Sequence, residues 1–301
     1  MSEIIGTKIS ENAIVLDAHL INTFRSCEQK FYFVDQQHIF PKKKKGAPAF
    51  GIAMHEGIAT YRTAKMRLTG SLPKLSYLVP DKVTGEPVPA TWPQDTGDCI
   101  MAGMSALKTA YEKHMPPESK GEVVVDERRS LDNALRIFEG YCNHYEKHNL
   151  TFRYVEVPFA MLIGIIDSPF TRTKREVIYT GIIDAVLDMA NYTYVNDLKS
   201  TGWNITQQWL EGFRLSQAQI GYVVVCRELL GLDVNSALIH AIWVQKEAKS
   251  GKGKPIDEYF QTFPCSWTKE QIDEWHLNTL KTAERIEARR AEGYWQRDFG
   301  S

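Results

Sequence analysis

The chain of 301 residues is 43% hydrophobic and 24% charged, with a formal net charge of −1 at pH 7. These proportions are ordinary for a globular protein and exclude wholesale disorder. A net charge this small gives no overall signal for nucleic acid, so any surface that binds it must be a local patch. Basic runs at 41–46, 246–254 and 284–290 are candidates, although solvated surface is the commoner role of such runs.

Cysteine usage and hydropathy indicate a soluble, cytoplasmic protein. No stretch approaches the roughly 20 apolar residues of a membrane span, and the N-terminal MSEIIGTKISEN lacks the basic and apolar regions of a signal peptide. The cysteines lie far apart with no C-x-x-C pair, which suggests reduced thiols inside a cell. They are Cys27, Cys99, Cys142, Cys226 and Cys265.

The first half of the chain reads as helical, because its apolar residues recur at helical spacing. Asp17 is placed to cap the first of these helices. Residues 69–97 are rich in Pro, Gly and Thr, which predicts a long surface insertion. The expected helices span 16–35, 50–68, 98–115 and 127–148.

The pattern changes at residue 151, where Val, Ile, Tyr and Phe become frequent and favour strands. The order of elements predicts a mixed central β-sheet flanked by helices, with an N-terminal helical layer, in one α/β domain over 1–301. Its 1–150 portion is mainly helical, and its 151–301 portion contains the sheet. The expected strands span 152–163, 176–189, 192–200, 235–245 and 257–266, and the expected helices span 213–231 and 268–293.

The strand at 192–200 contains an acid and a base two positions apart, Asp197 and Lys199. Side chains at positions i and i+2 of a strand point to the same face. The preceding strand contributes Asp184. A hairpin that turns at residues 190–191 makes residues whose numbers sum to 381 face each other, so Asp184 lies opposite Asp197 with Cβ atoms about 5 Å apart. A slip of one residue makes the two acids a diagonal pair instead.

Two opposed carboxylates repel each other, so a positive group is expected between them. Lys199 is one candidate and a divalent cation is the other, because a cage of hard oxygen ligands suits Mg²⁺ or Mn²⁺. The alternative is a surface salt bridge between Asp197 and Lys199, which is usually worth under about 1 kcal/mol. Ile182 and Val186 share the acidic face, and ionisable groups among apolar neighbours are more often functional.

Five ordered motifs resemble the PD-(D/E)XK nuclease superfamily, and within it the RecB-like branch that includes phage exonucleases and CRISPR-adaptation nucleases. SCEQKFYF at 26–33 is similar to the branch's Cys-x-x-(Lys/Arg)-Phe-Tyr helix, and GIAMH at 51–55 is similar to its Gly-x-x-x-His element. GIIDAV supplies the strand aspartate, NDLKST the Asp-x-Lys pair and SQAQIGY the Gln/Tyr helix. The resemblance covers about 20–230 and implies a restriction-endonuclease-like fold.

The resemblance also implies roles for the matching positions. The metal ligands would be His55, Asp184, Asp197 and the backbone carbonyl of Leu198, and the metal would be Mg²⁺ or Mn²⁺. Lys199 would be the catalytic lysine. The Gln/Tyr helix would pack beside the site, where it would contact substrate phosphate or hold the lysine. The implied catalytic set is thus Asp184, Asp197, Lys199, His55, Gln219 and Tyr222.

Four assignments depend on spacing and on position in the chain. The family motif reads Gln-x-x-x-Tyr, whereas here Gln219 precedes Tyr222 by three residues and Gln217 precedes it by five. Residues three apart share a helix face, which favours Gln219 as the glutamine of the motif. Gln217 is then expected to bind DNA. Trp203 is either ordinary core or a platform for a base of single-stranded DNA. Glu156, on the strand before, is expected to support the metal ligands from behind.

An iron–sulfur cluster is not expected. Some relatives hold a [4Fe–4S] cluster with one N-terminal cysteine and three clustered C-terminal cysteines. Cys27 matches the first position, but the C-terminal EGYWQRDFGS has no cysteine, and such a cluster needs four thiolates. Cys27 is therefore expected to be a buried helix residue.

These residues predict a Mg²⁺- or Mn²⁺-dependent deoxyribonuclease. The resemblance favours an exonuclease acting on DNA ends in recombination, replication or repair, as in phages, with a recombination or replication protein as partner. One rival is a non-catalytic DNA-binding or scaffolding protein on the same fold, which should lack an acid or the lysine. The other rival is a sequence-specific endonuclease, which needs a dimer and a base-reading element. Residues 69–97 are the one segment long enough to hide that element.

Overall fold

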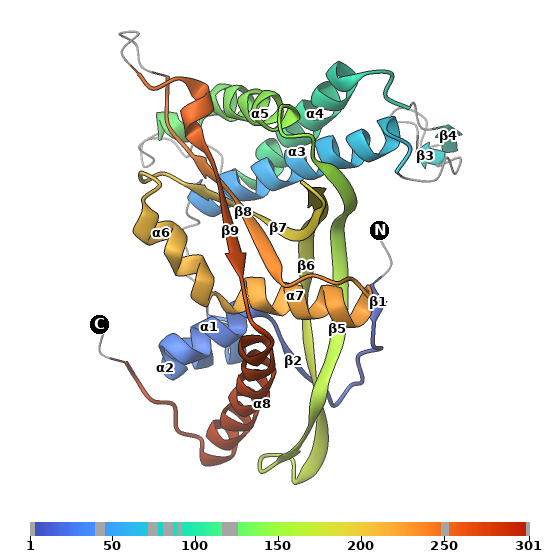
Figure 1. Ribbon diagram of the computed structural model, residues 1–301. Coiled ribbons are helices and arrows are strands. Elements are labelled where there is room, and N and C mark those ends of the chain that lie inside the picture. Colours follow the sequence, from blue (N-terminus) through green and yellow to red (C-terminus); the bar gives the residue numbers. More distant parts are fainter. Residues whose placement is uncertain are drawn as a thin grey trace.

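The computed structural model describes residues 4–39, 46–71, 92–115, 126–247 and 253–298, together with two short strands, β3 (Leu78–Pro80) and β4 (Pro87–Pro89). These two strands pair as an antiparallel hairpin inside the predicted insertion (Figure 1). The other residues between 72 and 91, and most of the basic runs at 41–46 and 246–254, lie outside the described residues. No helix among the described residues has the length and apolar character needed to cross a membrane.

Seven of the described strands form one mixed sheet, which confirms the predicted α/β fold. An antiparallel meander consists of β5 (Thr151–Ser168), β6 (Thr173–Met189) and β7 (Tyr192–Thr201). Next to β7 lies parallel β8 (Ser236–Trp243), followed by antiparallel β9 (Phe260–Ser266). The short strands β1 (Ile5–Gly6) and β2 (Ile14–Leu16) add in parallel to β5 and β6.

Helices cover both faces of this sheet, as the element order predicted. On one face lie α1 (Ala18–Ser26), α7 (Gln217–Leu229) and α8 (Lys269–Glu292), joined to the strands by buried residues such as Trp275. On the other lie α3 (Gly46–Leu68), α4 (Thr96–His114) and α5 (Leu131–Glu146), joined through residues such as Phe138. In Figure 1, α3, α4 and α5 lie together at the top, whereas α7 crosses the strands lower down.

Close backbone contact fixes α3 against α4. A Cβ atom on Gly103 would lie 2.3 Å from Cζ of Phe138 and 2.9 Å from the backbone oxygen of Gly57. A Cβ atom on Gly57 would in turn lie 2.8 Å from Cβ of Leu107. Only glycine fits at such a crossing, because distances under about 3 Å force the neighbours to move. The contact holds α3 in place, and α3 is the helix that carries His55.

The predicted helix at 16–35 is divided in the structure. It forms α1, then α2 (Glu28–Phe31) and a π-helical turn at Tyr32–Gln36. Asp17 caps α1 as predicted, accepting a hydrogen bond from the backbone N–H of Leu20 at 2.7 Å. The break falls at Cys27, whose backbone is extended and whose sulfur accepts from the N–H of Lys30. Cys27 is partly exposed, so the prediction of a buried helix residue is wrong.

The second half differs from the prediction in smaller ways. The helix expected at 213–231 begins only at Gln217, after α6 (Gln207–Glu211) and a 3₁₀ turn at Gly212–Leu215. The closing helix α8 begins with a Thr268–Gln271 capping box and ends at Gly293 in the left-handed conformation. Short 3₁₀ turns also precede α5 and β9, at Glu127–Arg129 and Ile256–Tyr259.

The β6–β7 hairpin turns where the sequence predicted. Ala190 and Asn191 both have positive φ, 49° and 69°, as a two-residue turn that matches the strand twist requires. The pairs run from Met189–Tyr192 to Ala185–Asn196, and each pair sums to the predicted 381. This register brings Asp184 next to the Asp-x-Lys segment of β7.

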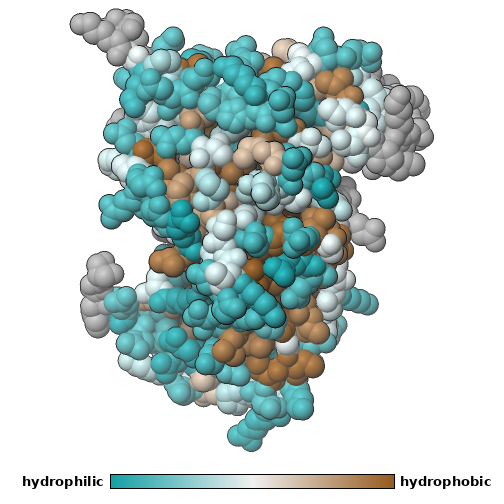
Figure 2. All heavy atoms as spheres, in the orientation of Figure 1, coloured by the Kyte–Doolittle hydropathy of each residue, from teal (hydrophilic) through white to brown (hydrophobic). Residues whose placement is uncertain are grey.

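The face drawn in Figure 2 is mostly hydrophilic. Hydrophobic residues gather low on this face, in the region of β5 and α8. Exposed apolar residues of these two elements include Leu162, Ile165 and Leu277. This patch lies apart from α3, which Figure 1 places at the top of the same view.

Candidate active site

Several elements bring their polar side chains together where the β6–β7 pairing ends. The pairing stops at Ala185–Asn196, one position short of the two acids expected to oppose each other. Instead of facing Asp197 directly, Asp184 accepts a hydrogen bond on Oδ2 from the backbone N–H of Leu198 at 2.9 Å. A carboxylate therefore replaces a strand-to-strand hydrogen bond, and its second oxygen remains for another partner.

His55 reaches the same point from α3. Its Nδ1 lies 3.4 Å from Oδ2 of Asp184, and its Nε2 lies 3.1 Å from the carbonyl oxygen of Leu198. The backbone of Leu198 is thus held on both polar atoms, by an acid on its N–H and by an imidazole on its oxygen. The structure brings together His55, Asp184 and the Leu198 carbonyl, as the sequence motifs implied.

Glu156 lies closer to His55 and Asp184 than the sequence predicted. Its neighbours Val155 and Val157 pair with Ala185 and Ile183, so Glu156 stands opposite Asp184 across β5 and β6. Its φ of 50° is unusual for a residue other than glycine, and such conformations cluster at functional sites. Ligand atoms of His55, Glu156 and Asp184 all lie within 4.8 Å of one another. Glu156 therefore lies in the same group of ligand atoms as His55 and Asp184, closer than a residue that supports the ligands from behind would need to be.

Asp197 and Lys199 form a buried ion pair beside this group. The ammonium of Lys199 lies 2.9 Å from Oδ1 and 2.7 Å from Oδ2 of Asp197. Asp197 is 2% exposed, whereas the Lys199 side chain is 37% exposed. Burial alone would lower the pKa of Lys199, but Asp197 and Asp184 outweigh it and hold that pKa above its ordinary value. Lys199 is thus a persistent cation that remains open to solvent.

The helix α7 supplies the second partner of Asp197. Gln219 is fully buried and donates from Nε2 to Oδ2 of Asp197 at 2.7 Å, which favours Gln219 over Gln217 as the residue that contacts the site. Gln217 is the first residue of α7, and its side-chain oxygen is buried without a hydrogen-bond partner. Tyr222 packs edge-on against Phe159 with ring centroids 6.1 Å apart. It lies one helical turn beyond Gln219, and burial, together with the charges of Asp197 and Asp184, raises its pKa.

The donor set suits a hard divalent cation. Carboxylate and carbonyl oxygens with one imidazole are ligands that Mg²⁺ and, more readily, Mn²⁺ accept. Within the described part of the chain, no Lys or Arg forms an ion pair with Glu156 or Asp184. Burial, with the added charge of Asp184, raises the pKa of Glu156 to about 7. A bound cation would relieve the repulsion between the carboxylates of Glu156 and Asp184.

Trp203 follows β7 and is not core. Its side chain is 85% exposed, so the reading of Trp203 as ordinary core is wrong. Its loop is held by Arg128, which donates to the carbonyl of Gly202 at 3.4 Å. A Cβ atom on Gly202 would lie 3.0 Å from Nη2 of Arg129. Two guanidinium groups therefore lie beside Gly202, the residue that precedes Trp203.

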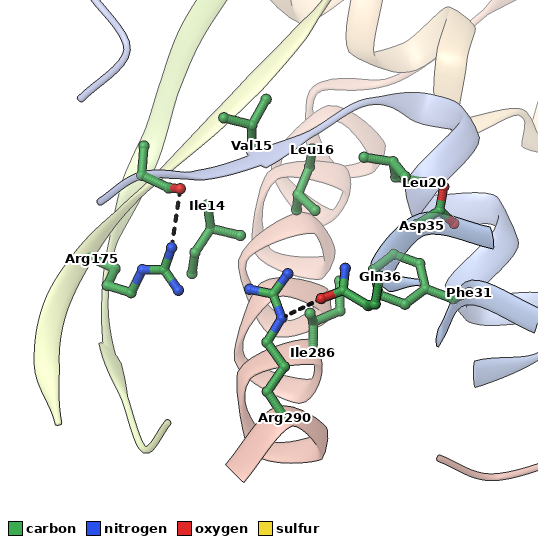
Figure 3. A pocket seen from close by; sticks show the side chains of 11 residues that line it. Ile14, Val15, Leu16, Leu20, Phe31, Asp35, Gln36, Arg175, Ile286 and Arg290 are labelled. Carbon is green, nitrogen blue, oxygen red and sulfur yellow. Dashed lines mark hydrogen bonds between the residues drawn. The ribbon is translucent and has the colours of Figure 1, made fainter. Parts of the chain in front are cut away.

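A separate cavity lies among ion pairs that stabilise the packing of α8. It has a volume of about 250 Å³ and lies between β2, α8 and the π-helical turn (Figure 3). Arg290 donates to Gln36 at its wall, and Arg175 donates to the backbone of Ala13. Both guanidinium groups also bind Glu287, which is fully buried in α8. The Arg175–Glu287 ion pair connects β6 to α8, whereas the Arg290–Glu287 pair lies within α8. None of the residues that line the cavity belongs to the acidic group.

Comparison with known families agrees with this arrangement. Residues 18–295 match the family described as the PD-(D/E)XK nuclease superfamily. The match covers every element that supplies the site, namely α3, β5, β6, β7 and α7. No curated protein matches the chain.

Proposed function

Because the chain belongs to the PD-(D/E)XK nuclease superfamily, we propose that it is a Mg²⁺- or Mn²⁺-dependent deoxyribonuclease that digests DNA from its ends. The observation that carries this proposal is the convergence of His55, Glu156 and Asp184 within 4.8 Å. Beside them stands a lysine whose ammonium is paired with a buried aspartate and is still open to solvent. Acids that can hold a cation, next to a fixed positive charge, are what phosphodiester hydrolysis requires.

The residues divide into two roles. His55, Glu156, Asp184, Asp197 and the Leu198 carbonyl would hold the cation. The chemistry that a bound Mg²⁺ or Mn²⁺ supplies is polarisation of the phosphodiester and a nucleophilic water at neutral pH. Lys199 would orient that water or stabilise charge on the scissile phosphate, and Gln219 would keep Asp197 in place through its 2.7 Å hydrogen bond. Tyr222 would flank the substrate phosphate.

The choice of an exonuclease rests on the resemblance of the motifs to the RecB-like branch. That branch also suggests a place in recombination, replication or repair, with a recombination or replication protein as partner. A non-catalytic DNA-binding protein on this fold is less consistent with the site, because its acids and its lysine are all in place. A sequence-specific endonuclease would need a base-reading element, for which the segment containing β3 and β4 is the remaining candidate.

The first test uses end-labelled linear DNA and a covalently closed circle of the same sequence. The purified protein should degrade the linear DNA with Mg²⁺ or Mn²⁺, spare the circle, and be inactive in EDTA. Cleavage of the circle as well would replace the exonuclease by an endonuclease. Binding of DNA without cleavage of either form, with both metals, would reject the enzyme in favour of the binding protein.

Trp203 provides a prediction about DNA binding. Stacking of a base on an aromatic ring is worth about 1–3 kcal/mol, and Arg128 and Arg129 both pair with Asp126. These three side chains together carry a net positive charge close to Gly202, the residue before Trp203. We expect Trp203→Ala to weaken binding of a single-stranded oligonucleotide by about 5- to 100-fold.

Fluorescence anisotropy with a labelled oligonucleotide in EDTA measures this binding without cleavage. Trp203→Phe should retain most of the affinity, because the ring still stacks. Tyr192→Ala is the matched control, since Tyr192 is 68% exposed at the opposite end of β7. An equal loss in the Tyr192 and Trp203 variants, or no loss in either, would remove Trp203 from the DNA interface.

A further inference from the structure

Arg62 is a buried cation on α3 that no part of the proposed mechanism uses. It is 2% exposed. Its Nη2 donates to the hydroxyl of Tyr141 at 2.8 Å and to Oδ1 of Asn196. Its guanidinium lies 5.4 Å from the ring centroid of Phe152, and its Nε has no hydrogen-bond partner. Among the described residues, no carboxylate forms an ion pair with Arg62.

The hydrogen-bond partners of Arg62 do not supply a negative charge. Tyr141 contacts Nδ1 of His240 at 3.0 Å, and burial, together with Arg62 itself, lowers the pKa of His240 well below its ordinary value. The network of Arg62, Tyr141, Asn196 and His240 is therefore positive overall. A buried ion without a counter-charge is costly, so an offsetting charge is expected close by.

The acidic group of the active site is placed to provide that charge. Arg62 follows His55 by seven residues, which is two turns along the same face of α3 and a rise of about 10 Å along the helix axis. Asn196, which Arg62 binds, precedes Asp197 and also donates to the carbonyl of Leu238 at 2.8 Å. Asn196 also pairs across the strands with Ala185, the residue that follows Asp184.

We propose that Arg62 is the internal counter-charge of the acidic group: it holds Glu156 and Asp184 together before a divalent cation binds, and it competes with that cation afterwards. Arg62 is thus a positioning residue that does not touch substrate. This inference rests on the proposed metal site and adds a device that sets how tightly the site holds its metal. A neutral residue at position 62 leaves the acids to repel each other until a cation joins them.

The test compares Arg62→Met and Arg62→Lys with the wild type by thermal unfolding and by calorimetric titration with Mn²⁺. Arg62→Met should have a lower Tm in EDTA and a larger rise of Tm with Mn²⁺ than the wild type, because the cation then replaces a missing charge. Its affinity for Mn²⁺ should be about 10- to 100-fold tighter, since a buried like charge that repels the cation is gone. Arg62→Lys keeps the charge and should retain the affinity of the wild type.

Tyr141→Phe is the matched control, because it removes the hydroxyl that binds Arg62 and leaves every charge in place. It should lower Tm equally with and without Mn²⁺. Equal loss of Tm by Arg62→Met in both conditions, with unchanged Mn²⁺ affinity, would overturn the proposal and leave Arg62 a packing residue. Arg62→Gln repeats the charge removal if the methionine variant does not fold, and failure of both neutral variants to fold in saturating Mn²⁺ would also overturn it.

Failure of this inference and failure of the nuclease assignment give different results. A wild type that cleaves DNA, together with an Arg62→Met variant that binds Mn²⁺ as the wild type does, rejects the counter-charge alone. A wild type that binds neither Mn²⁺ nor Mg²⁺ rejects the metal site and the counter-charge with it.

Discussion

Replacement of Lys199 by alanine is expected to lower the rate of metal-dependent DNA cleavage by about 100- to 1000-fold, which is the usual loss when one electrostatic donor is removed from an active site. The ammonium of Lys199 touches both carboxylate oxygens of Asp197, which places it to reach a phosphate bound beside that acid. Alanine removes this charge and leaves the acids unchanged. Initial rates on end-labelled linear DNA in saturating Mn²⁺ measure the loss.

In the Lys199→Ala variant, a loss of catalytic rate has to be distinguished from a loss of stability. Without Lys199, the side chain of buried Asp197 retains, among the described residues, the hydrogen bond from Gln219 alone, so Tm should fall in EDTA and recover partly with Mn²⁺. Lys199→Met keeps the aliphatic stem and should be equally inactive. The control is Lys147→Ala, which removes an exposed lysine paired with Asp257 at 3.1 Å and should leave the rate unchanged. A Lys199 variant that is folded and cleaves within a few-fold of the wild type would exclude this lysine from catalysis.

The register of the β6–β7 hairpin, which brings Asp184 close to the Asp-x-Lys segment, was predictable from the sequence because two local rules decide it. Side chains alternate along a strand, and a tight hairpin at Ala190-Asn191 leaves a single register in which the apolar residues of both strands face the core. Neither rule depends on distant parts of the chain. The observed pairs from Met189–Tyr192 to Ala185–Asn196 follow them without a shift.

The position of Glu156 could not be predicted from local rules of this kind. Its position opposite Asp184 depends on the pairing of β5 with β6, which contains two register shifts, and on a positive φ at a residue for which the sequence gives no such signal. The short strands β1 and β2 were missed because two or three residues are too few to show an alternating pattern.

The sequence patterns also did not predict whether Trp203 and Arg62 are buried or exposed. Trp203 follows an apolar strand and is nevertheless exposed, whereas Arg62 lies within a long helix and is nevertheless buried. In both cases the outcome depends on which elements pack against the residue. For Arg62 these are α5 and β7, which meet α3 only in the folded protein. A charged residue on the inner face of α3 could have drawn attention, but nothing in the sequence identifies its partners.

Replacement of Asp184 by asparagine should separate metal binding from folding. Asparagine has nearly the same shape, and its side-chain oxygen can still accept the hydrogen bond from the N–H of Leu198. It removes one negative charge from a group in which Glu156 and Asp184 lie within 4.8 Å of each other. We therefore expect Tm in EDTA to be unchanged or higher, because like charges repel. Affinity for Mn²⁺ should fall by at least about 100-fold, since the variant loses a ligand charge.

Calorimetric titration with Mn²⁺ and the rise of Tm on adding Mn²⁺ measure this loss, and cleavage of linear DNA should fall with them. Asp188→Asn is the matched control, because Asp188 lies on the same strand and the same face and pairs with Arg153 at 2.7 Å. It should reduce stability by less than about 1 kcal/mol and leave the response to Mn²⁺ unchanged. If Asp184→Asn loses stability in EDTA and still binds Mn²⁺ as the wild type does, Asp184 is a structural acceptor for the Leu198 N–H. The cation would then have to be held by other residues.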